Sequence, residues 1–156
     1  MDRKHWFREL SLLIERAPIE IFIFEVLIII ILIQSAVLLL EIIFGVFITG
    51  VLAESAKLVV REKRPKNAAE RKIYSRTFRL NRRSFPSAHT AIAMFFPGLL
   101  FGTFLFIPTL VFGVFVGYTR LYLKDHFPRD VVAGGAIGLI IGYLMPMAFI
   151  ALRHMI

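Results

Sequence analysis

The sequence of 156 residues contains no cysteine. A disulfide framework and a metal site built from thiolates are therefore both excluded. Charged residues are also few, at 19%, whereas 58% of the residues are hydrophobic and the mean hydropathy is +0.74. Apolar runs such as residues 26–33, together with sixteen phenylalanines, indicate that the solvent of this chain is lipid. We expect one membrane domain over residues 1–156, since no internal repeat or low-complexity tract divides it.

Acidic residues are in the minority, because 11 Asp and Glu stand against 19 Lys and Arg and give a net charge of +8. Ten of the basic residues lie between residues 61 and 83, where Glu62 and Glu70 are the only acids. Such a basic block beside apolar segments could bind nucleic acid, anionic lipid headgroups or a phosphate substrate. Because the chain is expected to lie in a membrane, we expect the lipid bilayer as a partner and no nucleic acid, and the basic block leaves both anionic lipid headgroups and a phosphate substrate open. The residues specify no oligomeric state.

No cleavable signal peptide is expected in residues 1–17, because charges are spread throughout and no small-residue cleavage site follows an apolar core. The apolar residues of this segment recur at helical spacing, with charges on the other face. They are Trp6, Phe7, Leu10, Leu13 and Ile14. This pattern indicates a helix lying in the membrane interface, with Trp6 as an anchor. A plain lead-in to the first span is the alternative.

Glycine and proline are absent from residues 34–41, in the middle of the apolar stretch 18–60. A single helix over that stretch would be roughly 65 Å long, about twice the hydrocarbon thickness of a bilayer. We therefore predict two spans within residues 18–60, joined by a short turn within residues 34–41.

A polar, basic loop is expected over residues 61–88, followed by a last apolar region, residues 89–156. Its predicted spans are about 89–107, about 108–123 and about 130–152. Pro97 and Pro108 are the expected kink or turn points. Glycines recur every four residues in the last span and favour close helix packing; they are Gly134, Gly138 and Gly142. The predicted fold is an all-α, polytopic membrane helical bundle of about five transmembrane helices with an N-terminal interfacial amphipathic helix.

Residues suited to phosphate chemistry gather at the ends of the predicted spans. Residues 57–65 close the second span, residues 86–89 open the third, and residues 119–130 connect the fourth span to the fifth. Because helical spans alternate in direction, these ends fall on the same side of the membrane. A random scatter of histidine and arginine has no reason to be arranged in this way.

His126 and Asp130 are four residues apart, so one helical turn brings the carboxylate beneath the imidazole. That pairing fixes the histidine tautomer and leaves the other ring nitrogen free to act as a base or nucleophile. A helix end with a solvated charge cluster is the alternative reading of this segment.

A helix that begins near Ser87 presents unpaired N–H groups to an anion. Lys57, Arg64 and Arg120 add three positive charges, and His89 supplies a second acid or base. A phosphoryl group needs cradled oxygens, an in-line nucleophile and a proton donor. Together with His126, these residues fill all three roles.

These motifs resemble the type 2 phosphatidic acid phosphatase superfamily, whose signature is KxxxxxxRP, PSGH and SRxxxxxHxxxD. Residues 57–65 (KLVVREKRP, ending in Pro65), 86–89 (PSAH, beginning with Pro86) and 119–130 (TRLYLKDHFPRD) match the three elements in turn. Ala88 replaces glycine and stays small, although it excludes a left-handed backbone there. Thr119 replaces serine and retains a hydroxyl. The resemblance covers the chain from residue 57 onward.

The resemblance implies that His126 attacks phosphorus and forms a phosphohistidine, and that Asp130 orients it. His89 would protonate the leaving group and then activate water. The phosphate oxygens would be held by Lys57, Arg64, Ser87 and Arg120, with backbone N–H groups around Ala88 and His89. The family works without a metal, so we expect no metal site and no cofactor. Residue types alone would allow zinc, but three neighbouring cations disfavour it.

The resemblance also implies a hydrolase that acts on a lipid phosphate at headgroup level. The candidates are lipid A 1-phosphate, undecaprenyl diphosphate, phosphatidylglycerol phosphate and phosphatidic acid. The basic loop suits a headgroup with several charges and favours lipid A 1-phosphate; its residues are Arg71, Lys72, Arg76, Arg79, Arg82 and Arg83. Attraction to bulk anionic lipid is the alternative role of this loop. A lipid phosphotransferase and a non-enzymatic lipid-binding protein are the alternatives of another class.

The resemblance implies a multi-pass protein of the bacterial inner membrane, with its active site on the outer face. The positive-inside rule would instead place the basic loop in the cytoplasm. We expect the outer face, because cations that bind a phosphate are not free topology signals.

Overall fold

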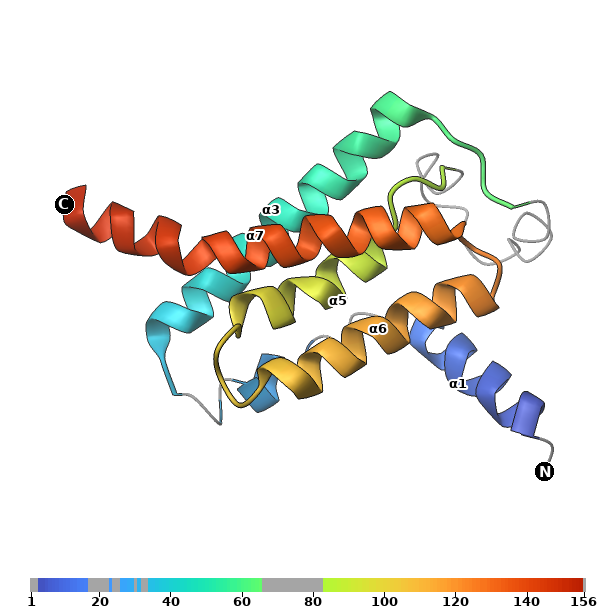
Figure 1. Ribbon diagram of the computed structural model, residues 1–156, viewed down its shortest axis with the longest axis horizontal. Coiled ribbons are helices and arrows are strands. Elements are labelled where there is room, and N and C mark those ends of the chain that lie inside the picture. The colour runs from blue at the N-terminus through green and yellow to red at the C-terminus, as the bar shows by residue number, and fades with distance from the viewer. Residues whose placement is uncertain are drawn as a thin grey trace.

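The computed structural model describes residues 3–16, 23, 26–29, 31, 34–65 and 83–155, and this part of the chain is all-helical (Figure 1). Its helices are α1 (Arg3–Arg16), α3 (Ala36–Val60), α5 (Ala88–Leu99), α6 (Phe106–Tyr122) and α7 (Pro128–Met155). The predicted all-α class is therefore confirmed. By length and composition, α3 and α7 could each cross a membrane. Most of the predicted first span, residues 18–33, lies outside the described residues.

The turn before α3 lies at Gln34 and Ser35, at the start of the range predicted from the sequence. Gln34 adopts a left-handed conformation with φ of +50°. The Ser35 hydroxyl then caps α3 by accepting a hydrogen bond from the Leu38 N–H at 3.3 Å. At the other end of α3, Arg61 has φ of +52° and its N–H donates to the Lys57 carbonyl. Both ends of this helix are thus closed by local hydrogen bonds.

α5 is the central helix of the bundle. In Figure 1 it lies between α6 and α7, and it packs most extensively against α7, then against α6 and α3. Phe95 and Phe96 of α5 are fully buried and join a core that includes Ile42 of α3 and Met145 of α7. The other helices expose apolar side chains on their outward faces, as lipid-facing helices do.

Glycines of α7 allow its close contact with α5. A methyl group at any of three glycines would overlap a backbone carbonyl oxygen of α5. The pairs are Gly134 with Ser87, Gly138 with Ala91, and Gly142 with Phe95. The two backbones are therefore in direct contact over roughly two helical turns, which agrees with the packing role predicted for these glycines.

α5 is shorter than the third span predicted from the sequence. It ends at Leu99 rather than near residue 107, and a turn containing Gly102, with φ of +81°, leads into α6. Pro97 lies inside α5, and Pro108 lies in the first turn of α6, where its missing N–H leaves no helical hydrogen bond unmade. Gly102 rather than either proline therefore marks the turn. With 12 residues, α5 is roughly 18 Å long, which is less than the hydrocarbon thickness.

α1 is attached to α6 by aromatic contacts. The Phe7 ring lies edge-on against Phe115, Tyr118 and Tyr122, with centroid distances of 6.1, 5.5 and 4.8 Å. Trp6 is 53% exposed. One face of α1 is thus docked on the bundle, while Trp6 is available as the interfacial anchor that the sequence predicts.

Replacing Gly138 by alanine is expected to destabilise the protein, because the new methyl group overlaps the Ala91 carbonyl oxygen. Overpacking of this kind typically costs about 1–3 kcal/mol. Gly50 of α3 is the matched control, since nothing lies within 4 Å of a methyl group placed there, and Gly50→Ala should be neutral or stabilising. Thermal unfolding of the detergent-solubilised variants measures both effects. An unchanged midpoint for Gly138→Ala would contradict the direct backbone contact.

Candidate active site

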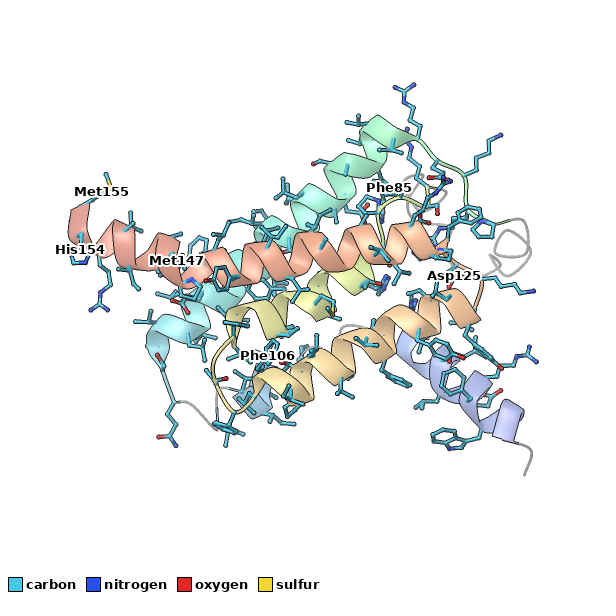
Figure 2. All side chains as sticks on the ribbon, in the orientation of Figure 1. Phe85, Phe106, Asp125, Met147, His154 and Met155 are labelled. Carbon is cyan, nitrogen blue, oxygen red and sulfur yellow. The ribbon has the colours of Figure 1, made fainter. Side chains whose placement is uncertain are left out.

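Four helix ends meet on one side of the bundle, as the sequence predicts. They are the C-termini of α3 and α6 and the N-termini of α5 and α7 (Figure 1). Phe85 and Asp125, labelled in Figure 2, mark this side of the molecule. The structure brings together here the residues that the sequence singled out: Lys57, Arg64, Ser87, Ala88, His89, Arg120, His126 and Asp130.

The His126–Asp130 pair is deeply buried at the start of α7. His126 is 4% exposed and Asp130 is inaccessible. Nδ1 of His126 lies 3.5 Å from Oδ2 of Asp130, which also accepts a hydrogen bond from the Phe127 N–H at 2.9 Å. A small movement of either side chain would complete a hydrogen bond from Nδ1, leaving the other ring nitrogen available for chemistry.

Cations surround both histidines. The charges of Lys57, Arg64 and Arg120 act on the imidazoles of His89 and His126, so all five side chains lie in one electrostatic environment. Lys57 is 5% exposed and Arg120 is 2% exposed. Buried positive charges attract an anion strongly, because little water screens them. The region is therefore suited to binding a multiply charged oxyanion.

Lys57 and Arg64 differ in their local partners. The Lys57 ammonium donates to Oε1 of Glu54, which lies one turn earlier on α3, at 2.5 Å. The Arg64 Nε is buried and has no hydrogen-bond partner among the described residues. An anion that binds here would compete with Glu54 for Lys57 and would offer Arg64 an acceptor.

The start of α5 faces the His126–Asp130 pair. Ser87 is the N-cap residue of α5, and its N–H donates to the Asp130 carbonyl oxygen at 3.0 Å. The Ser87 hydroxyl makes no capping bond but accepts a hydrogen bond from the Thr90 hydroxyl at 2.9 Å. The first N–H groups of a helix have no acceptor within it. Those of α5 are therefore placed where they could bind an anion, as helix N-termini do.

The two departures from the family signature are accommodated. Ala88 is not among the described residues with positive φ, so α5 begins here without the left-handed backbone that only glycine readily adopts. The buried Thr119 hydroxyl donates to the Val116 carbonyl at 2.7 Å and accepts a bond from Nε of Arg120 at 3.4 Å. The hydroxyl that threonine shares with serine thus contacts the arginine beside it.

His126 is uncharged at neutral pH. Burial is the largest influence on its pKa, and the charges of Arg64, Lys57 and Arg120 act in the same direction. A hydrogen bond with the Ser84 backbone opposes them, and the net result lowers the pKa of His126 to about 3. A neutral imidazole keeps the lone pair that a nucleophile needs.

Sequence reasoning did not identify Ser84, which is fully buried and donates a hydrogen bond from its hydroxyl to Oδ2 of Asp130. It also missed the ion pair between Glu62, after α3, and Arg129, in the first turn of α7. Proximity to the PSAH motif was the only signal for Ser84. The partners in both contacts are far apart in sequence, so no spacing rule would have paired them.

The basic loop is only partly described. Arg83, expected to bind a charged headgroup, instead donates a hydrogen bond from Nη1 to the Lys57 carbonyl oxygen at 2.7 Å and so closes the end of α3. The other arginines and the lysine predicted to bind the headgroup lie outside the described residues. His154, which belongs to no motif, is exposed near the far end of α7 (Figure 2).

Comparison with known proteins agrees with this geometry. The model of the PAP2 superfamily matches residues 36–153, a range that contains every predicted site residue. No curated protein and no solved structure matches the chain. The family match covers most of the chain and includes all four helix ends that form the site, so the chain belongs to the PAP2 superfamily.

Proposed function

We propose that this chain is an integral-membrane lipid phosphatase that forms a phosphohistidine on His126. Members of the PAP2 superfamily are phosphatases, so hydrolysis of a phosphoester follows from the family. The observation that carries the mechanism is the buried His126–Asp130 pair, with a neutral imidazole within the field of three cations. Such a pair has the nucleophile, the orienting carboxylate and the charge needed for phosphoryl transfer.

The reaction proceeds in two steps. Nε2 of His126 attacks phosphorus, the bond to the leaving oxygen breaks, and His89 donates a proton to that oxygen. In the second step His89 takes a proton from water, the water oxygen attacks phosphorus, and the bond between phosphorus and Nε2 of His126 breaks, which releases inorganic phosphate. Asp130 stabilises the positive charge that develops on the His126 ring while the phosphoryl group is attached.

The phosphate oxygens bind to Lys57, Arg64 and Arg120, with the Ser87 hydroxyl and the first N–H groups of α5, around Ala88. Lys57 exchanges its bond to Glu54 for one to phosphate. Negative oxygens offset the positive field around the histidines, which favours the protonated His89 that the first step requires. Substrate binding and acid catalysis are thus linked. None of these steps uses a metal.

The proposed substrate is a lipid whose phosphate lies at headgroup level, because the site lies at the ends of apolar helices. Lipid A 1-phosphate is the first candidate, on the strength of the basic segment 61–83. The alternative substrates, in order of preference, are undecaprenyl diphosphate, phosphatidylglycerol phosphate and phosphatidic acid. We place the protein in the bacterial inner membrane with the site on the outer face, as the family resemblance implies.

A lipid phosphotransferase is the second candidate function, because the same phosphohistidine could pass its phosphoryl group to an acceptor lipid. Phosphate release measured with and without added acceptor lipid separates these two functions. A non-enzymatic lipid-binding role is disfavoured, since such a protein has no need of both histidines and Asp130.

His126→Ala is expected to abolish phosphate release, because no other residue replaces the nucleophile; loss of a nucleophile typically lowers kcat by roughly 10⁶-fold. The assay measures inorganic phosphate released from the four candidate lipids in detergent, with EDTA present. His154→Ala is the matched control, since His154 is exposed and distant from the site (Figure 2). Activity that disappears on EDTA treatment of the wild-type protein would contradict the metal-free mechanism. Release by His126→Ala would contradict the assigned nucleophile.

The low pKa of His126 predicts a specific pH dependence of stability. Between about pH 6.5 and about pH 3 the unfolded chain binds a proton at His126 and the folded chain does not. The stabilisation is therefore complete above about pH 6.5 and is lost progressively as the pH falls toward 3. The test is to measure the thermal unfolding midpoints of the wild-type protein and of His126→Asn at several pH values between about 6.5 and about 3. If the midpoint of the wild-type protein falls with decreasing pH no more steeply than that of His126→Asn, the lowered pKa of His126 is refuted.

A further inference from the structure

Ser84 is a buried hydroxyl-bearing residue that belongs to none of the three signature motifs. It lies three residues before Ser87, in the segment that leads into α5. Its side chain is inaccessible to solvent, and its hydroxyl donates a hydrogen bond to Oδ2 of Asp130. A buried hydroxyl that contacts a carboxylate of the site restrains that carboxylate.

The two oxygens of the Asp130 carboxylate are held unequally. Oδ2 accepts hydrogen bonds from the Ser84 hydroxyl and the Phe127 N–H, and it is the oxygen nearer to His126. Oδ1 is buried and accepts no hydrogen bond from the described part of the chain. Phe127 belongs to the same turn as Asp130. Ser84 is therefore the donor that ties this carboxylate to a different segment of the protein.

Ser84 is itself fixed in place by backbone contacts. Its N–H donates to the Glu62 carbonyl at 2.8 Å, beside the isolated bridge between Lys63 and Arg83. Arg83 in turn donates to the Lys57 carbonyl at the end of α3. The Ser84 hydroxyl is thus attached to the same helix end that supplies Lys57, and it acts as a rigid donor.

We propose that Ser84 is a positioning residue whose hydroxyl orients the Asp130 carboxylate and thereby keeps His126 in its reactive tautomer. The inference rests on the proposed function, because it concerns the step that His126 performs. An Nδ1–H directed at Asp130 leaves the lone pair of Nε2 free to attack phosphorus. Without the Ser84 hydroxyl, the carboxylate can rotate away from Nδ1 of His126, which lies 3.5 Å from Oδ2.

Ser84 also contacts the other member of the pair, since the His126 imidazole hydrogen-bonds to the Ser84 backbone. A side-chain substitution leaves this backbone contact in place. Substitutions of Ser84 by alanine or cysteine therefore test the role of the hydroxyl alone.

A double-mutant cycle between Ser84 and Asp130 tests the proposal. The substrate is whichever candidate lipid phosphate the wild-type protein cleaves fastest, and kcat and KM are measured in detergent. Ser84→Ala should lower kcat by roughly 10- to 100-fold, as loss of residues that orient metal-bound histidines does, and should change KM by less than about 2-fold. In the Asp130→Asn background, Ser84→Ala should change kcat by less than about 3-fold, because its effect passes through Asp130.

Two further variants separate positioning from stability. Ser84→Cys keeps the side-chain volume but offers only a weak donor, so its kcat should fall between those of the wild type and Ser84→Ala. If Ser84→Ala does not fold, the kcat of Ser84→Cys tests the positioning role in its place. Ser35→Ala removes a hydroxyl bond at the opposite end of α3. This control should lower the unfolding midpoint and leave kcat unchanged.

Independent, multiplicative effects of Ser84→Ala and Asp130→Asn on kcat would overturn the proposal. So would a Ser84→Ala or Ser84→Cys protein with wild-type kcat, whatever its melting temperature. These results leave the proposed function intact, because the wild-type protein and His126→Ala run alongside as references. Absence of phosphate release by the wild-type protein would overturn the proposed function and this inference together.

Discussion

The direct contact between the backbones of α5 and α7 is the constraint on which the rest of the site depends. Three glycines of α7 let α5 approach until carbonyl oxygens of α5 touch the α7 backbone. At the end of this seam, the Ser87 N–H bonds to the Asp130 carbonyl. The start of α5 and the His126–Asp130 pair are therefore held together by the same backbone contacts. The three glycines, which carry no side chain, thus determine how the residues of the candidate site are positioned.

The electrostatics of the site are prepared for an anion. Burial, together with the charges of Arg64, Lys57 and Arg120, keeps the His126 imidazole neutral, and Lys57 and Arg120 are themselves nearly inaccessible to solvent. A bound phosphate changes this balance, because its oxygens offset the field of the cations. In the mechanism we propose, His126 is the neutral nucleophile, and the oxygens of a bound phosphate favour the protonated form of His89.

Sequence spacing was sufficient to predict which side chains lie together at these helix ends, because helix periodicity and the alternating direction of spans both follow simple rules. The turn after α5 was misplaced because a proline was taken as a helix boundary, whereas the first turn of α6 accommodates Pro108 and Gly102 makes the turn. The contacts of Ser84 and Arg83 join segments distant in sequence. These hydrogen bonds depend on tertiary packing, which cannot be predicted from a local sequence pattern.

The central claim is that phosphorus becomes bonded to His126 during turnover. Rapid acid-free quenching of the wild-type protein with its lipid phosphate, followed by peptide mass spectrometry, tests this most directly. We expect a phosphoryl group on the peptide that contains His126, stable in base and labile in acid, that appears before the steady state. A phosphoryl group on His89 or another residue would contradict it. So would turnover that produces phosphate with no phosphorylated peptide at any time.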